Sequence, residues 1–226
     1  MKTPLRFLLA ILILSGCKTY NYYTPAPNSA FFANAGETHI AGDLGIYRLD
    51  AKGGVALTKN ISLMGMYGGS PYNTYHASEG EVGMGFNSNY KEGFMFGLAA
   101  GYGLGNNYGK DSGAVNKNFY GSFTKPFFQF TMGAAGAHFE EHFTMKFDFM
   151  NYSGYKYQGN GDYASFNPNT FFWEPYFSGS MGGEHIRFEY GTGFAIKNVS
   201  QFFEGLRVCP WQFNIGLYII LNRKSE

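Results

Sequence analysis

The sequence predicts an all-β fold, an antiparallel up-and-down transmembrane β-barrel, and three observations support this. Large apolar residues alternate with small ones over long segments, glycine and aromatic residues dominate the composition, and no apolar run of 18 or more residues follows residue 17. The 226 residues include 32 Gly, 24 Phe and 18 Tyr but only 15% charged residues, a mixture that is not typical of helical enzymes. Without a transmembrane helix, strands are the remaining way to cross a bilayer.

The alternation is clearest in the segments 93–104, 185–197 and 208–221. In the first of them, residues such as Phe94 and Leu98 alternate with glycine and alanine. Because successive side chains of a strand point to opposite faces, each segment has one large apolar face and one small or polar face.

A soluble β-sandwich and a membrane barrel both produce such alternation. The polar face of a sandwich meets water and is normally rich in Lys, Glu, Thr and Ser, whereas here it is mostly Gly and Ala with isolated charges. The segments also reach the roughly 9–11 residues that a tilted transmembrane strand needs, while sandwich strands typically have about 5 or 6. Both features favour the barrel.

Alternation and turn signals predict about ten strands, with eight as the alternative count. Short connections alternate with longer ones, which is typical of outer-membrane barrels with short periplasmic turns and long external loops. The first hairpin is the exception, with a short outer turn expected near 49–52. The expected strands are 38–48, 52–58, 61–69, 79–88, 93–104, 118–135, 142–153, 171–181, 185–197 and 208–221.

The N-terminus has the features of a secretory signal. Lys2 and Arg6 precede the apolar run 7–14, and small residues lead to Cys17. The run Leu14-Ser15-Gly16-Cys17 resembles the lipobox of bacterial lipoproteins, over residues 1–17 only. That resemblance implies a covalent diacylglyceryl lipid, with acyl chains such as palmitate, on Cys17. No other cofactor is expected.

Three regions follow from these features: a signal peptide at 1–16, a lipidated N-terminal periplasmic tether at 17–37, and an outer-membrane barrel at 38–226. An even strand number returns both chain ends to one side, so we expect the lipidated N-terminus at the periplasmic face. The pattern over 38–221 is similar to small outer-membrane barrels of the Bacteroidota and of the OmpA and OmpX type. No family motif carries this porin-like resemblance, so it transfers no functional residue.

Charged residues of both signs fall on the inward face of separate predicted strands. A charge inside a barrel must be paired or hydrated, so they form either a salt-bridge network that fills the interior or the lining of a polar pathway or ligand pocket. Ten strands enclose only slightly more space than the eight whose interior side chains can fill, so general porin conduction is not expected. These residues are Asp43, Glu81, Lys146, Asp148, Arg187 and Glu189, with His39 and His185 nearby.

Two further clusters carry ligand or catalytic residue types. His138 and His142 flank Glu140 and Glu141, which are types that bind divalent metals. They fall at a predicted tight turn, where a polar cluster is solvated, so no metal site is expected.

A Ser-His-acid hydrolase arrangement is the second candidate chemistry. His185 and Glu189 share a face, as do His39 and Asp43, but no serine completes either pair. Ser62 lies near a predicted turn, and no G-x-S-x-G motif surrounds the two remaining candidates, Ser178 and Ser180. No catalytic residue is therefore expected.

The segment 152–169 is predicted to be an external loop rich in tyrosine. Aromatic residues at strand ends form the interfacial girdle of membrane barrels, and in loops they also provide recognition surfaces for a glycan or a protein. The candidates for recognition are Tyr155, Tyr157, Tyr163 and Trp173.

A net charge of +1 indicates no nucleic-acid partner, and with Cys17 lipidated, Cys209 has no partner for a disulfide. The sequence therefore predicts a non-enzymatic structural or accessory component of the envelope or of a larger outer-membrane assembly. Its expected partners are membrane lipid and an envelope protein, and no feature indicates an oligomeric state. The alternatives are a narrow channel or binder for a small or apolar ligand, and a lipid-modifying enzyme.

Overall fold

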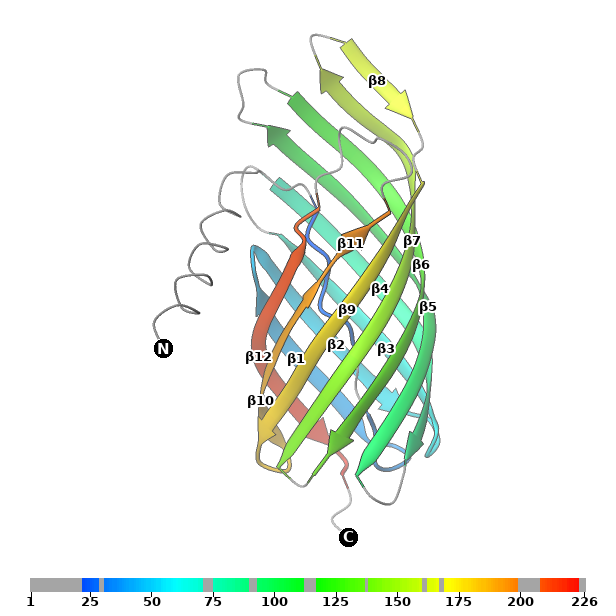
Figure 1. Ribbon diagram of the computed structural model, residues 1–226, viewed down its shortest axis with the longest axis vertical. Coiled ribbons are helices and arrows are strands. Elements are labelled where there is room, and N and C mark those ends of the chain that lie inside the picture. The colour runs from blue at the N-terminus through cyan, green and yellow to red at the C-terminus, as the bar shows by residue number, and fades with distance from the viewer. Residues whose placement is uncertain are drawn as a thin grey trace, which may run out of the picture.

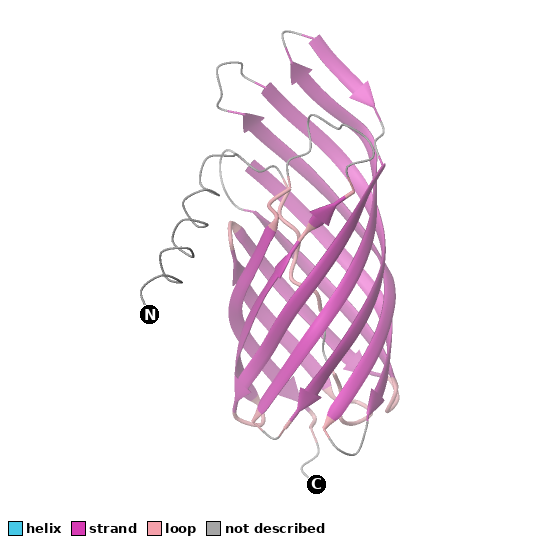
Figure 2. Ribbon diagram, in the orientation of Figure 1, coloured by secondary structure: helices cyan, strands magenta, loops and turns pink. Residues whose placement is uncertain are grey.

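The computed structural model describes residues 22–28, 31–70, 75–89, 93–111, 117–136, 138–159, 162–166, 169–198 and 208–223. Strands dominate these residues (Figure 2). The strands are β1 (Thr38–Gly45), β2 (Arg48–Ala56), β3 (Ile61–Ser70), β4 (Tyr75–Asn89), β5 (Phe94–Asp111), β6 (Lys117–Ala135), β7 (Phe139–Gly159), β8 (Asp162–Phe166), β9 (Asn169–Gly182), β10 (Ile186–Phe194), β11 (Ile196–Lys197) and β12 (Trp211–Leu221).

Ten of these strands form a closed antiparallel barrel, which confirms the predicted fold class and strand count (Figure 1). Neighbouring strands in the chain pair in order from β1 to β7, β7 then pairs with β9, and β12 returns to β1. The two remaining strands are additions to the wall: β8 forms a hairpin with β7, and β11 pairs with β9. Among the described residues, no helix is long and apolar enough to cross a membrane.

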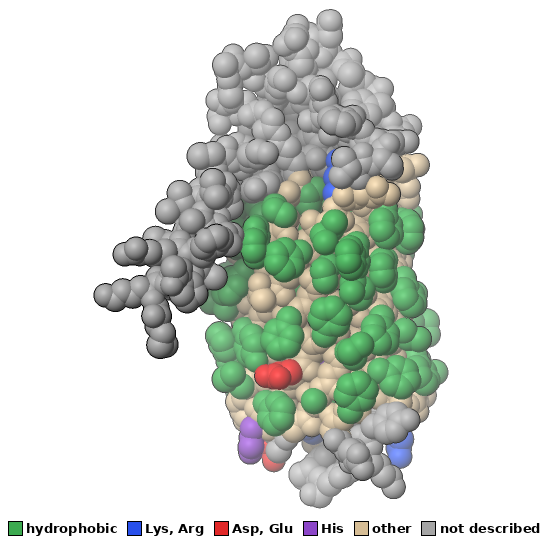
Figure 3. Space-filling view, in the orientation of Figure 1, with side chains coloured by type: hydrophobic (Ala, Val, Ile, Leu, Met, Phe, Trp, Pro, Cys, Tyr) green, Lys and Arg blue, Asp and Glu red, His purple; other side chains and the backbone are tan. Residues whose placement is uncertain are grey.

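The outer wall is covered with apolar side chains (Figure 3). On β12 the odd-numbered residues, from Trp211 to Leu221, are exposed, while Gln212 and Asn214 between them are buried. The same alternation continues round the barrel, where Leu44, Leu63, Val82, Leu104 and Phe188 are all exposed. Each strand therefore has an apolar outer face and a polar inner face, as the period of two predicts.

The barrel has a turn end and a loop end. The turn end, where β12 ends, has the short connections near residues 57–60 and 183–185 (Figure 1). At the loop end, β5 and β7 extend further, to Asp111 and Gly159.

The predicted strand boundaries differ from the structure at several places, such as β4, which begins at Tyr75 and not at 79. The first turn is Ile46–Tyr47, with Tyr47 at φ 57°, and not 49–52. The cause is that Arg48, Asp50 and Lys52, which look like turn residues in the sequence, are inward strand residues buried by ion pairs.

Another difference concerns the predicted loops at 105–117 and 154–170, which are largely strand. Glycine, asparagine and tyrosine make these segments look like loops, but the ladder between β5 and β6 continues to Asp111, and β7 and β8 form a hairpin. Backbone hydrogen bonds hold such a hairpin together, so it can form from residue types that are common in loops.

The described residues 22–28 and 31–37, which were expected in a periplasmic tether, occupy the lumen up to Phe32 and then reach its turn end, where Ala33, Ala35 and Gly36 are exposed. We call these residues the plug segment. Residues 24–27 are all buried, and so are Phe31 and Phe32. Residues 24–27 have no period because they are buried on all sides, and Pro25 and Pro27 lack an N–H that would need an acceptor there.

Candidate functional site

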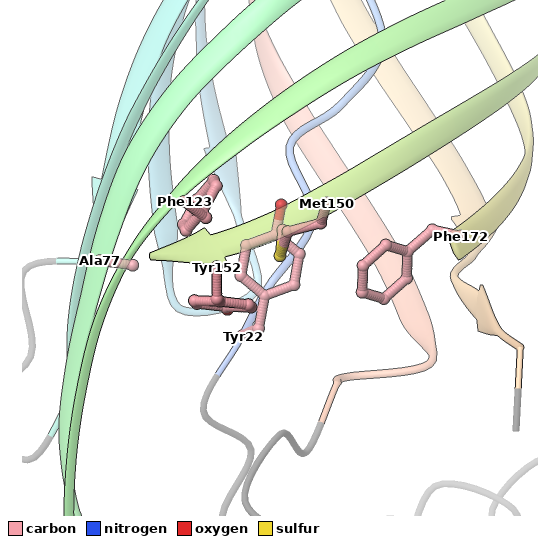
Figure 4. Packing of buried hydrophobic residues seen from close by; sticks show 6 residues of the cluster. All are labelled: Tyr22, Ala77, Phe123, Met150, Tyr152 and Phe172. Carbon is pink, nitrogen blue, oxygen red and sulfur yellow. The ribbon is translucent and has the colours of Figure 1, made fainter. Parts of the chain in front are cut away.

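The lumen contains the plug segment and most of the buried charges of the described residues, so it is the candidate site. At its loop end, the Tyr22 ring packs against Phe123 and Phe172, with ring centroids 5.9 and 5.7 Å apart. Ala77, Met150 and Tyr152 complete this buried cluster (Figure 4). Tyr152 was expected in an external loop, but it is an inward residue of β7.

The Tyr22 hydroxyl connects the plug segment to a set of ion pairs that we call the Lys125 network. The hydroxyl donates to Glu79 at 3.0 Å and accepts from Lys125 at 3.1 Å. The network contains Arg48, Asp50, Glu79, Glu81, Lys125, Lys146 and Asp148.

Lys125 lies at the centre of this network. Its ammonium nitrogen is 2.6 Å from Glu81, 3.1 Å from Glu79 and 3.6 Å from Asp148. Lys146 makes a second contact to Glu81, at 2.8 Å. Because Lys125 is completely buried, its charge has to be compensated inside the lumen, and these carboxylates do so.

Lys52 forms a smaller group with two of the predicted lumen charges, which we call the Lys52 triad. Its ammonium nitrogen lies 2.8 Å from Asp43 on β1 and 2.5 Å from Glu189 on β10. The triad therefore joins strands on both sides of the β1–β12 pairing, which closes the barrel.

A third set of polar residues, the Arg187 network, lies at the turn end and contains Glu37, His39, Glu140, Arg187 and Arg223. Arg187 is 2.7 Å from Glu140, and Arg223 is 3.4 Å from the same carboxylate and 3.1 Å from Glu37. His39 Nε2 is 2.5 Å from Glu37, and its Nδ1 contacts the Tyr218 hydroxyl. The last residue of the plug segment is thus held by the wall and by the chain beyond β12.

The contact between Glu37 and Arg223 shifts the pKa values of the two groups in opposite directions. Burial opposes the ionisation of Glu37, but the hydrogen bond with His39 and the charge of Arg223 outweigh it, and the pKa of Glu37 is lowered. Burial likewise opposes the charge on Arg223, but Glu37 and Glu140 outweigh it and raise its pKa. Both groups are therefore held in their charged forms.

Between these networks, backbone and ring contacts fix the plug segment. The Asn28 side-chain amide donates to Gly53 O at 2.8 Å and to Gly65 O at 3.2 Å. The Gln129 amide donates to Asn28 O at 3.0 Å. Phe31 and Phe32 lie against the rings of His142 and His39, with centroids 4.8 and 4.4 Å apart.

Little space remains around the plug segment. One cavity beside Asn28, Lys52 and His142 has a volume of about 20 Å³, and another beside Tyr23 and Arg48 is equally small. Each has room for about one water molecule. Small-molecule pockets typically have about 300–1,000 Å³, so neither cavity holds a ligand of that size.

All six lumen charges chosen from the sequence are buried in the lumen, and His39 joins them. Arg187 pairs with Glu140 and not with Glu189. His185 is exposed at the turn end, where its ring contacts Ile220 O at 3.2 Å, so it is not a lumen residue.

Sequence reasoning missed several charged residues of the lumen. Face parity could have identified some of them, because Glu79 shares the face of Glu81, and Glu140 and Glu174 occupy inward positions of β7 and β9. The missed residues are Glu37, Arg48, Asp50, Lys52, Glu79, Lys125, Glu140, Glu174 and Arg223.

The cluster from His138 to His142 was expected at a solvated turn, but β7 begins at Phe139. His138 and Glu141 are exposed, whereas Glu140 and His142 are buried in the lumen. Within the part of the chain that the structure describes, no three His, Cys, Asp or Glu residues are arranged to hold a metal ion.

The pairs considered for catalysis are not brought together. His39 contacts Glu37 and not Asp43, and exposed His185 is separated from buried Glu189. Ser62 is buried in β3. A different set does meet, since Ser178 and Ser180 on β9 lie opposite His142 and Glu140 on β7. The cavity beside this set has only about 20 Å³, which is too small for an acyl chain.

The aromatic residues chosen for recognition are placed differently from the prediction. Tyr155 and Tyr157 belong to β7 and Tyr163 to β8, while their side chains lie outside the described residues. Trp173 is on the outer wall of β9, 40% exposed, with its indole N–H against the sulfur of Met145. This position fits an interfacial girdle and not a loop.

Of the two cysteines, the structure describes only Cys209. Cys17 lies outside the described residues. Cys209 is buried before β12, where burial raises the pKa of its thiol, which donates a hydrogen bond to Trp211 O.

No protein-family model matches this chain, and no curated protein matches it. Among solved structures, it is similar to the N-terminal β-barrel domain of Pseudomonas aeruginosa OprF, with 9% identity and a TM-score of 0.41 over 83% of this chain and 98% of that one. It is also similar to the translocator domain of the autotransporter NalP from Neisseria meningitidis, with 10% identity and a TM-score of 0.42 over 96% of this chain and 93% of that one.

Proposed function

We propose that this chain is a self-plugged outer-membrane β-barrel lipoprotein that acts, without catalysis, as a structural or accessory component of the cell envelope or of a larger outer-membrane assembly. The observation that carries the proposal is the filled lumen. The plug segment and three sets of paired charges occupy it and leave cavities of about 20 Å³. A closed interior favours a role for the outer surfaces of the barrel over transport through it.

The apolar outer wall supports a membrane location. Its exposed side chains include Leu63, Val82, Leu104 and Leu217, with Trp173 and Trp211 nearer the loop end. A wall of this kind is stable in lipid, where a closed barrel leaves no strand edge unpaired. Short connections at one end and long strands beyond the other fit a turn end in the periplasm and a loop end outside the cell.

Conductance measurements test the closed lumen. The full chain in planar lipid bilayers is expected to give no reproducible current steps. Deleting residues 22–36 is expected to produce them, because the deletion removes the segment that fills the lumen. Phe32→Ala, which keeps the full chain but removes a ring stacked on His39, is expected to give brief openings.

Lys59→Ala, at an exposed turn, is the matched control and is expected to stay silent. Reproducible conductance from the unmodified chain that Arg187→Ala abolishes would support the narrow-channel alternative and overturn the closed-lumen proposal.

The enzyme alternative has a separate test. Ser178, His142 and Glu140 all line one cavity, but its volume of about 20 Å³ is too small for a lipid. Mass spectrometry of lipid A and phospholipids from a deletion strain is expected to match the parent strain. A lost acyl chain or a new lipid species would overturn the non-enzymatic assignment.

A further inference from the structure

The two ends of the plug segment lie at opposite ends of the barrel (Figure 1). At the turn end, Gly36 N donates to Ala56 O at 2.7 Å, and Glu37 pairs with Arg223 beyond β12. At the loop end, Tyr22 forms a parallel bridge with Val208, and Cys209 N donates to Tyr22 O at 2.9 Å. These contacts lie just before β12 begins, so the segment spans the length of that strand.

The contacts between these ends follow one another in chain order. Tyr22 contacts the Lys125 network, Asn28 contacts β2 and β3, and Phe32 stacks on His39. The segment therefore passes once through the lumen. Its first described residue, Tyr22, lies at the loop end.

The length of the chain restricts where Cys17 can lie. Four residues separate it from Tyr22, and the five steps between the two residues cover at most about 3.5 Å each, so Cys17 lies within about 18 Å of Tyr22. The 11 residues of β12 run from the level of Tyr22 to the turn end. At about 3.3 Å per residue and a tilt of about 40°, they span about 28 Å along the barrel axis. The turn end is therefore beyond the reach of Cys17.

A return path through the barrel is also closed. Beside the described residues of the segment, the lumen contains two cavities of about 20 Å³ each, too small for a second passage of the chain. A path along the outer wall would place unpaired backbone groups in lipid, at a cost of several kcal/mol each.

We infer that the barrel threads its own lipidated N-terminus outward, so that the acyl chains on Cys17 enter the outer leaflet of the outer membrane. The inference rests on the proposed function, which places the loop end outside the cell. It replaces the sequence-based expectation of a periplasmic anchor. The N-terminus is thereby displayed at the cell surface, on the side of the membrane opposite to the C-terminus.

The test places a cleavable site between the lipid and the plug. A recognition sequence for a site-specific protease is inserted between Thr19 and Tyr20, and cells are grown with an alkyne analogue of palmitate. The protease is too large to cross the outer membrane. When it is added to intact cells, the barrel is expected to lose its acyl label on a denaturing gel.

A variant with the same site after Glu226 is the matched control, and it is expected to be cut only after the cells are permeabilised. A label that stays on the barrel in intact cells but is released after permeabilisation would overturn the inference. A barrel that never takes up the label, with Cys17→Ser giving the same result, would overturn the lipid assignment and the inference with it.

A third site, inserted between Gly113 and Ala114 in the predicted external loop, distinguishes failure of the threading inference from failure of the proposed function. If intact cells expose that site but not the N-terminal one, the barrel is in the outer membrane as proposed and only the threading is wrong. If neither is cut, the proposed orientation is wrong as well.

Discussion

The outer wall and the lumen are built from the same strands but are stabilised by different interactions. On the wall, Leu217 is 61% exposed and needs only apolar surroundings. In the lumen, Lys125 is completely buried and needs three carboxylates from two other strands. For a wall residue it is therefore enough that the side chain is apolar and points outward. A lumen residue depends on particular partners far away in the chain.

The largest expected effect is in the lumen. Lys125→Met leaves Glu79, Glu81 and Asp148 with too little positive charge in a buried site, so the free energy of unfolding is expected to fall by about 3–5 kcal/mol. Urea unfolding of the barrel in lipid vesicles, followed by tryptophan fluorescence, measures this change.

Lys59→Met at the exposed turn is the control and is expected to unfold as the parent chain does. If Lys125→Met and Lys59→Met lowered the free energy of unfolding equally, the carboxylates around Lys125 would not depend on its charge.

A smaller effect is expected on the wall. Leu217→Arg places a charge near the middle of the apolar surface and is expected to cost about 2–4 kcal/mol in vesicles. Leu57→Arg, which is also exposed but lies in a connection at the turn end, is expected to cost about 0–1 kcal/mol. The same unfolding measurement compares them, and equal costs would mean that lipid does not cover the wall around Leu217.

The smallest effect is expected where the plug segment joins β1. Glu37→Gln removes the charge that faces Arg223 and is expected to cost about 1.5–2 kcal/mol at pH 7. Because the pKa of Glu37 is lowered in the folded state, its contribution is complete above its ordinary pKa of 4.5 and is lost as the pH falls through the lowered value.

Unfolding of the parent and the variant should therefore converge as the pH is lowered from 7 to below 4.5. Glu184→Gln, at an exposed turn, is the control and should behave as the parent at every pH. A difference for Glu37→Gln that did not change with pH would show that its charge has no role in fixing the segment.

The strands were predictable because the period of two is local. Any segment such as 93–104 shows which residues face lipid without reference to the remaining chain, and the turns that separate the strands are local as well. The first turn was misplaced because Arg48 and Lys52 are stabilised in the lumen by Glu79 and Glu189, which are distant in the sequence.

The plug segment could not be predicted for the same reason. It has no period, and its contacts join residues far apart, such as Tyr22 with Glu79 and Gln212 with Thr24. Lumen charges such as Asp43 and Asp148 were identified from their inward parity, but parity does not select a partner, as the pairing of Arg187 with Glu140 shows.

The residues just before β1 and just after β12 contact each other, and these contacts affect how the barrel assembles. Gly36 and Glu37 immediately precede β1, Asn222 and Arg223 immediately follow β12, and these four residues bind each other: the Asn222 amide donates to Gly36 O at 3.4 Å, and Arg223 is 3.1 Å from Glu37. The β1–β12 seam, which is the last to become available as the chain is made, is thus held by contacts to the plug segment itself. These contacts need both the closed seam and the end of the plug segment in place, so the closed barrel and its filled lumen stabilise each other.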